Sequence, residues 1–92
     1  MIKTFKHKGL EILFYKGIPK GIQSKHKVRI LNILDLLNAA DTIRVMNFPG
    51  SNLHKLEPKN GDKWSVKVSG NWRITFKFIN GNAYDVNYED YH

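Results

Sequence analysis

Three segments of the sequence carry side chains suited to proton transfer and to phosphate binding. His54 lies in "LHKL", Arg73 in "NWRITF", and Asp90, Tyr91 and His92 in "NYEDYH". Histidine exchanges protons near neutral pH, and arginine offers a forked donor that matches phosphate oxygens. RNA carries its own nucleophile, the ribose 2′-OH, so a protein must supply only a base, an acid and a cation for the developing charge. These residues are therefore candidates for metal-independent cleavage of RNA.

Each candidate also has an ordinary structural explanation. A single histidine at a strand end is commonly a surface residue, and Arg73 can solvate an exposed sheet face. Tyr91 can pack against a sheet edge, and Asp90 can pair with any of the 15 lysines and arginines. Taken one by one, the residues leave both readings open.

The sequence lacks the motifs of several other enzyme classes. The four histidines show no metal-ligand spacing, and no carboxylate completes a set, so no metal site is predicted. A glycine-rich phosphate loop and a G-x-S-x-G motif are both missing, which argues against NTP-using and acyl-transfer enzymes. We expect no cofactor.

Length and composition predict a single small domain, residues 1–92. The chain is 41% hydrophobic and 25% charged, as in ordinary globular domains. The sequence contains no run of about 18 apolar residues, so we expect no membrane helix. The segment "MIKTFKHKGL" lacks the apolar core of a signal peptide. Because the chain has no cysteine, we expect a reducing, cytoplasmic location.

The positive charge indicates the class of partner. Fifteen basic residues against eight acidic ones give a formal net charge of +7. Such a charge attracts a polyanion over long range, either a nucleic acid or an acidic protein. Solubility alone is the alternative explanation.

Two helices are expected in the first half of the chain. Apolar residues at helical spacing predict a short helix from about His7 to Lys16, which Gly17 can end in a left-handed cap. Ser24 is the expected N-cap of a longer helix that ends near Ala39. Its expected apolar stripe comprises Val28, Ile30, Leu31, Ile33, Leu34 and Leu37.

The start of the second helix carries several cations. Lys25, His26 and Lys27 fall in its expected first turn, with Arg29 just after. Cations there oppose the helix dipole, at a cost of a few tenths of a kcal/mol each. Either this end of the helix meets an anion, or it is a solvated helix start.

The second half of the chain alternates with a period of two, which is typical of strands. A short strand is expected near residues 53–57, followed by longer ones over 64–69, 72–79 and 83–88, with tight turns at Gly70–Asn71 and Asn80–Gly81. Residues 2–5 form a further short strand. The pattern predicts an α+β fold in which two helices pack on a small twisted antiparallel sheet that the N-terminal strand joins.

The two faces of the expected sheet differ in character. Trp72, Ile74, Phe76 and Phe78 should face the helices, together with Tyr84, Val86 and Tyr88 of the last strand. Lys67, Arg73, Thr75 and Lys77 should lie on the other face, open to water or to a ligand.

At this point the sequence resembles a known family. "MIKTFKHKGLEILFYKG", "LHKL", "WSVKVSGNWRITFKF" and "NYEDYH" are similar, in order and spacing, to HigB toxins of the RelE/ParE toxin–antitoxin superfamily. The resemblance implies a RelE-like fold and ribosome-dependent endonuclease activity that cleaves mRNA within translated codons and halts growth. It also implies a helix-turn-helix antitoxin of the HigA type, which represses the operon, so that operator DNA is contacted only through the antitoxin.

The resemblance also assigns roles to residues. His54 matches a general acid or base, Arg73 the phosphate-binding arginine, and Asp90, Tyr91 and His92 the catalytic tail. Which histidine is base and which is acid stays open. Glu57 departs from the pattern, because some relatives have a lysine there. The expected contacts to mRNA and to ribosomal RNA in the decoding site of the small subunit are Lys20, Lys25, Lys27, Arg29, Lys55, Lys59, Lys67 and Lys77.

Two other functions are compatible with the sequence. One is a non-catalytic toxin of the ParE kind, which poisons gyrase through a protein interface. The other is a basic module that only binds RNA or the ribosome. The terminal Asp90-Tyr91-His92 set favours cleavage over the ParE kind, because ParE-like chains usually lack it. Intact mRNA on saturating ribosomes would instead indicate the binding module.

Overall fold

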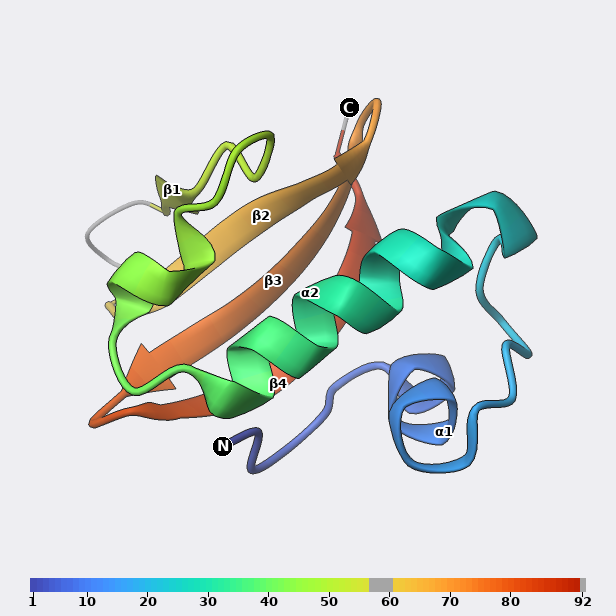
Figure 1. Ribbon diagram of the computed structural model, residues 1–92, viewed down its shortest axis with the longest axis horizontal. Coiled ribbons are helices and arrows are strands. Elements are labelled where there is room, and N and C mark those ends of the chain that lie inside the picture. The colour runs from blue at the N-terminus through green and yellow to red at the C-terminus, as the bar shows by residue number, and fades with distance from the viewer. Residues whose placement is uncertain (57–60, 92) are drawn as a thin grey trace.

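The computed structural model describes residues 1–56 and 61–91. Two α-helices, α1 (Lys8–Lys16) and α2 (Lys27–Ala39), come first, and four strands follow (Figure 1). The strands are β1 (His54–Lys55), β2 (Lys63–Ser69), β3 (Trp72–Ile79) and β4 (Asn82–Asp90). Short 3₁₀ helices occur at η1 (Ser24–His26) and η2 (Ile43–Met46). The predicted α+β class is confirmed.

The strands form one antiparallel sheet in the order β1-β2-β3-β4. The β3–β4 turn is formed by Asn80 and Gly81, whose φ angles of 50° and 78° are both positive, as the predicted type I′ turn requires. The predicted turn at Gly70–Asn71 joins β2 to β3. The chain end therefore runs back along β3, because β4 is hydrogen-bonded to it over nearly its whole length.

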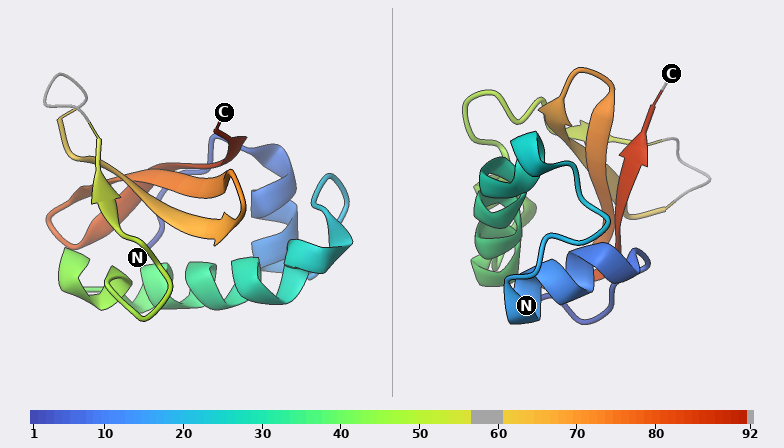
Figure 2. Two further views of the ribbon diagram at one scale, coloured as in Figure 1. Left: turned by 90° about the horizontal axis from the view of Figure 1, so that it is seen from above. Right: turned by 90° about the vertical axis from the view of Figure 1, so that its right-hand side faces the viewer.

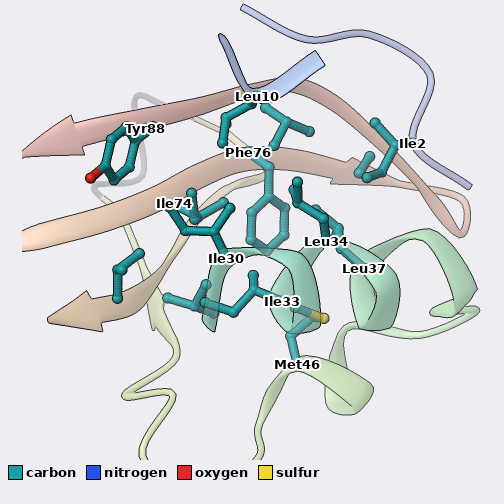
Figure 3. Close-up of a cluster of buried hydrophobic side chains, with 14 of the residues drawn as sticks. Ile2, Leu10, Ile30, Ile33, Leu34, Leu37, Met46, Ile74, Phe76 and Tyr88 are labelled. Atoms are coloured by element: carbon teal, nitrogen blue, oxygen red, sulfur yellow. The ribbon is translucent and has the colours of Figure 1, made fainter. Parts of the chain in front are cut away.

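Helix α2 lies along one face of the sheet, and the core fills the space between them (Figure 2). Ile30, Ile33, Leu34 and Leu37 of α2 are fully buried or nearly so, as are Ile74 and Phe76 on the facing strand (Figure 3). Among the described residues, no helix covers the opposite face of the sheet, which we call the open face.

Helix α1 follows the predicted bounds closely. His7 is its N-cap, and its Nδ1 accepts a hydrogen bond from the Leu10 N–H at 3.1 Å. Gly17 ends the helix in the left-handed conformation, with φ 72°. The predicted cap at Gly17 is therefore confirmed, whereas the N-terminal cap by the His7 side chain was not predicted.

The start of the second helix differs from the prediction. Ser24 is not its N-cap, because residues 24–26 form the separate turn η1 and α2 begins at Lys27. Val28 was expected in the apolar stripe but is 71% exposed. His26 is buried, and its Nδ1 lies 2.6 Å from the Tyr88 hydroxyl. The side chain of His26 thus turns into the protein instead of facing an anion in solvent.

A β-bulge corrects the predicted face of Tyr84. The register of β3 and β4 shifts between Thr75 and Lys77, and Asp85 takes a positive φ of 54°. Beyond this shift the alternation is reversed, so that Ala83, Val86 and Tyr88 are the buried residues of β4. Tyr84 is only half-buried and does not share their face.

The N-terminal segment joins the sheet, though in parallel orientation and through isolated bridges. Ile2 pairs with Ala83 and Phe5 with Val86, next to the outer edge of β4. The Lys3 N–H donates to the Ala83 carbonyl at 2.7 Å, and the Lys6 N–H donates to the Val86 carbonyl at 2.9 Å. The segment therefore covers an edge that would otherwise expose unpaired backbone groups.

Candidate functional site

The register of the sheet decides which side chains share the open face, since directly paired residues point to the same side. Lys67, Arg73 and Glu89 pair in one row across β2, β3 and β4. Two residues along the strands, a second row contains His54, Ser65, Thr75 and Asn87.

Four candidate side chains, three in these rows and one beyond them, form a continuous series that we call the diagonal track: His54, Lys67, Arg73 and Tyr91. His54 and Lys67 are diagonal neighbours, about 7–8 Å apart, and Lys67 is directly opposite Arg73, at about 5 Å. Tyr91 follows Glu89, the residue opposite Arg73, by two positions. A cationic centre therefore lies between a histidine on one side and a tyrosine on the other.

The centre of the open face is less accessible than predicted. Thr75 is fully buried and Ser65 is 4% exposed. The expectation that Thr75 lies open to water is therefore wrong. The two residues are directly opposite each other, and together with their neighbours they form a packed floor beside the diagonal track.

Arg73 is held by the backbone of the β2–β3 turn. Its Nη1 donates to the Gly70 carbonyl at 2.7 Å and to the Trp72 carbonyl at 3.1 Å. Arg73 as a whole is half-buried. The turn that connects the strands thus orients the cation of the site.

Glu89 is a residue of the site that the sequence analysis missed. It is half-buried, lies directly opposite Arg73, and accepts a hydrogen bond from the Thr75 hydroxyl. The only signal in the sequence is that Glu89 precedes Tyr91 by two positions, which places both side chains on one face of an extended strand.

Tyr91 lies beside both charged residues. Its N–H donates to the Asn71 carbonyl at 2.8 Å, which extends the β3–β4 pairing by one residue. Partial burial raises the pKa of the Tyr91 hydroxyl, the Glu89 carboxylate raises it further, and Arg73 lowers it. The group is thus a hydrogen-bond donor at neutral pH.

Asp90 does not join this group. It pairs with Trp72 and follows Tyr88 by two positions, so the register directs it to the opposite face of the sheet. In agreement, its charge helps to raise the pKa of the Tyr88 hydroxyl, after burial as the main cause. The register therefore separates Asp90 from Arg73 and Tyr91 on the strand, and its role in a catalytic tail stays a prediction. His92 lies outside the described residues.

The predicted RNA contacts divide between several surfaces. Lys67 and Lys77 lie on the open face, whereas Lys55 pairs with Trp64 and has its ammonium 5.6 Å from the centre of that ring. Lys20 and Lys25 are exposed on the segment before α2, and Lys27 begins that helix. Lys59 and Glu57 lie outside the described residues.

Arg29 has a clear structural role. Its Nη2 donates to the Gly50 carbonyl at 2.9 Å and to the Lys67 carbonyl at 3.0 Å, and its guanidinium lies 5.7 Å from the centre of the Phe48 ring. It thereby connects α2, the loop of residues 47–53 and strand β2.

In residues 1–56 and 61–91, no group of three or more histidines, cysteines or carboxylates is placed to hold a metal ion.

Comparison with known proteins assigns the family. A family model described as the RelE-like toxin of type II toxin–antitoxin system HigB matches residues 3–92. The chain belongs to the HigB-like toxin family. A curated relative, endoribonuclease HigB of Proteus vulgaris, is 48% identical over 95 residues, and the match covers 100% of both chains.

Family membership identifies the chain as a toxin of a type II toxin–antitoxin system and implies an antitoxin as its partner. No helix in the part of the chain that the structure describes is long and apolar enough to cross a membrane.

Proposed function

We propose that this HigB-like toxin is a ribosome-dependent endoribonuclease that cleaves mRNA within translated codons. The observation that carries the proposal is the diagonal track, in which Lys67 and Arg73 lie between His54 and Tyr91 on the open face. The relative from Proteus vulgaris, whose name describes an endoribonuclease, supports it.

The proposed chemistry uses the 2′-OH of the RNA as nucleophile. A base removes its proton as the oxygen attacks the adjacent phosphorus, and an acid protonates the 5′ oxygen as the P–O5′ bond breaks. The products are a 2′,3′-cyclic phosphate and a free 5′-OH. Arg73 and Lys67 stabilise the negative charge that develops on the phosphoryl oxygens.

His54 is the proton-transfer group on one side of this centre, and Tyr91 lies on the other side. His92 is the second histidine proposed for proton transfer, from the resemblance to HigB toxins. The proposal does not fix which histidine is the base. No metal takes part, since the 2′-OH and the two cations provide the nucleophile and the charge stabilisation.

The ribosome and the antitoxin enter through the resemblance to HigB toxins. In the cytoplasm, the decoding site would present a single-stranded codon, and the net charge of +7 would attract ribosomal RNA. Lys20, Lys25 and Lys27 are exposed or half-exposed cations available for docking. The partner in the resting cell is a HigA-type helix-turn-helix antitoxin, through which alone the toxin reaches operator DNA.

Primer extension on a reporter mRNA tests the proposal. Wild type, Arg73→Ala and His92→Gln are induced separately, and α1 provides Lys16→Gln as a variant that removes one exposed charge elsewhere. We expect new 5′ ends inside translated codons for wild type and Lys16→Gln, and none for the other two. Growth arrest without new ends would overturn the proposal in favour of gyrase poisoning or of RNA binding alone.

A further inference from the structure

A second feature of the open face lies beyond the diagonal track. It is a hollow of about 330 Å³ whose lining includes Lys6, Lys63, Thr75, Lys77, Asp85 and Asn87. Three cations therefore surround one hollow that contains a single carboxylate. Only Lys77 among the three was expected to contact RNA.

The fold brings these lysines together from three separate segments. Lys63 begins β2 and is directly opposite Lys77 of β3. Lys6 comes from the N-terminal segment, where its own N–H donates to the Val86 carbonyl of β4 at 2.9 Å. The bulge at Asp85 places that carboxylate 3.7 Å from Lys77, although both side chains are about half-exposed.

Ordinary roles of surface lysines do not account for this arrangement. Lysines often protect the edge of a sheet from aggregation, which accounts for Lys6 beside the outer edge of β4 but not for Lys63 and Lys77, because β2 and β3 are the two inner strands of this sheet. Like charges directly opposite each other destabilise a pair of strands. One exposed ion pair with Asp85 offsets little of this repulsion. A bound anion would relieve the repulsion between the lysines.

The position of the hollow indicates which anion it is. Lys77 and Arg73 lie on the same face of β3, four residues apart, which is roughly 13 Å along the strand. The hollow is therefore within reach of a single RNA strand held at Arg73, a few nucleotides away. We propose that Lys6, Lys63 and Lys77 bind a backbone phosphate of the mRNA that flanks the cleaved one; this inference rests on the proposed function.

Binding to ribosomes with a non-cleavable mRNA, which carries a 2′-O-methyl group at the cleavage position, tests the inference without requiring cleavage. The test variant is Lys6→Gln/Lys63→Gln. The matched control, Lys16→Gln/Arg44→Gln, also removes two exposed or half-exposed charges, from α1 and η2. We expect the test variant to lower the slope of log affinity against log salt by about 0.7, since the lysines are proposed to bind one phosphate and each single-strand phosphate contact contributes about 0.7.

Neutral methylphosphonate linkages in the mRNA then identify the phosphate. Placed singly on either side of the cleavage position, one such linkage should weaken binding of wild type and of the control, and have no further effect on the test variant. A loss of affinity in the test variant with no sensitive linkage would overturn the inference, because the lysines would then contact ribosomal RNA. An equal loss in test variant and control would overturn it as well.

Failure of the proposed function gives a different result. In that case wild type leaves the ordinary, cleavable mRNA intact on the same ribosomes, whatever the linkage experiment shows. Thermal unfolding of both double variants confirms that each is folded before binding is measured.

Discussion

Glu89 lies directly opposite Arg73 on the open face and accepts a hydrogen bond from the buried Thr75 hydroxyl. The cation proposed to hold the scissile phosphate thus has a fixed carboxylate as its cross-strand neighbour. A carboxylate there weakens the attraction of the site for an RNA phosphate. It also contributes to the raised pKa of Tyr91.

Replacing this carboxylate should strengthen RNA binding. Two unit charges about 7 Å apart in a water-like environment repel by roughly 0.6 kcal/mol, so Glu89→Gln should bind the non-cleavable mRNA roughly 2–5-fold more tightly. The measurement is affinity on programmed ribosomes. Asp35→Asn on α2 is the control, since it removes one exposed negative charge elsewhere. An equal gain in both variants would show that net charge, and not the position of Glu89, matters.

Tyr91 can act through its hydroxyl or through its ring, and two variants separate these roles. If the hydroxyl donates a proton or a hydrogen bond in the transition state, Tyr91→Phe should lower the cleavage rate on programmed ribosomes by roughly 10²-fold and leave affinity nearly unchanged. If the ring stacks on a base, Tyr91→Ala should in addition lose about 1–3 kcal/mol of binding. A Phe variant that cleaves at the wild-type rate would exclude the hydroxyl from the chemistry.

The sequence predicts the strands and turns well because their signals are local. Asn80-Gly81 has one favoured hairpin conformation, and alternation in residues 72–79 is regular. The bulge at Asp85 has no comparable signal. Aspartate tolerates a left-handed conformation only somewhat better than other residues, and the Asp85 N–H is held by the Thr4 side chain, 81 positions away in the sequence. The face of the sheet to which Tyr84 points therefore depends on tertiary contacts.

The composition of the site was harder to predict than its location. His54, Lys67, Arg73 and Tyr91 share the open face as their alternation suggests. The same alternation directs Asp90 to the other face of the strand. Choosing candidates by their chemical type alone does not show this difference. The positions of Glu89 beside Arg73 and of Lys63 beside Lys77 follow only from the strand register, which fixes cross-strand neighbours.

Arg29 provides a test of structure against RNA contact. Because its guanidinium joins the Gly50 and Lys67 carbonyls, Arg29→Ala should lower the free energy of unfolding by about 1–3 kcal/mol. Arg29→Lys should restore only part of it, since an ammonium lacks the fork. Chemical denaturation measures both. Lys25→Gln, on the exposed turn before α2, is the control and should change the unfolding free energy little. A stable Arg29→Ala protein with weakened ribosome binding would instead support the RNA contact.

The contact between His26 and Tyr88 predicts a loss of stability in mild acid. His26 Nδ1 lies 2.6 Å from the Tyr88 hydroxyl, and Tyr88 stacks on Trp72 with ring centres 4.5 Å apart. Burial, with a smaller effect of Lys25, lowers the pKa of His26; burial also lowers that of His7, whose ring lies edge-on to Tyr88.

These shifts fix the sign of the pH dependence. Below about pH 6.5 the unfolded chain binds more protons at these histidines than the folded chain does. The stabilisation is therefore complete above about pH 6.5 and is lost as the pH falls through the lower pKa values of the folded state. We expect the free energy of unfolding to decrease between about pH 7.5 and about pH 5.5, above the range in which most carboxylates titrate.

Denaturant unfolding across this range, with three variants, checks the assignment. His26→Gln should be less stable than wild type at about pH 7.5 but should lose less on acidification, because one of the two imidazoles with a lowered pKa is gone. Tyr88→Phe should cost about 1–3 kcal/mol at the higher pH, since it leaves His26 Nδ1 buried without the hydroxyl. The exposed His54→Gln is the control and should follow the wild-type curve. If His26→Gln follows that curve as well, the contact between His26 and Tyr88 is not what makes the fold sensitive to acid.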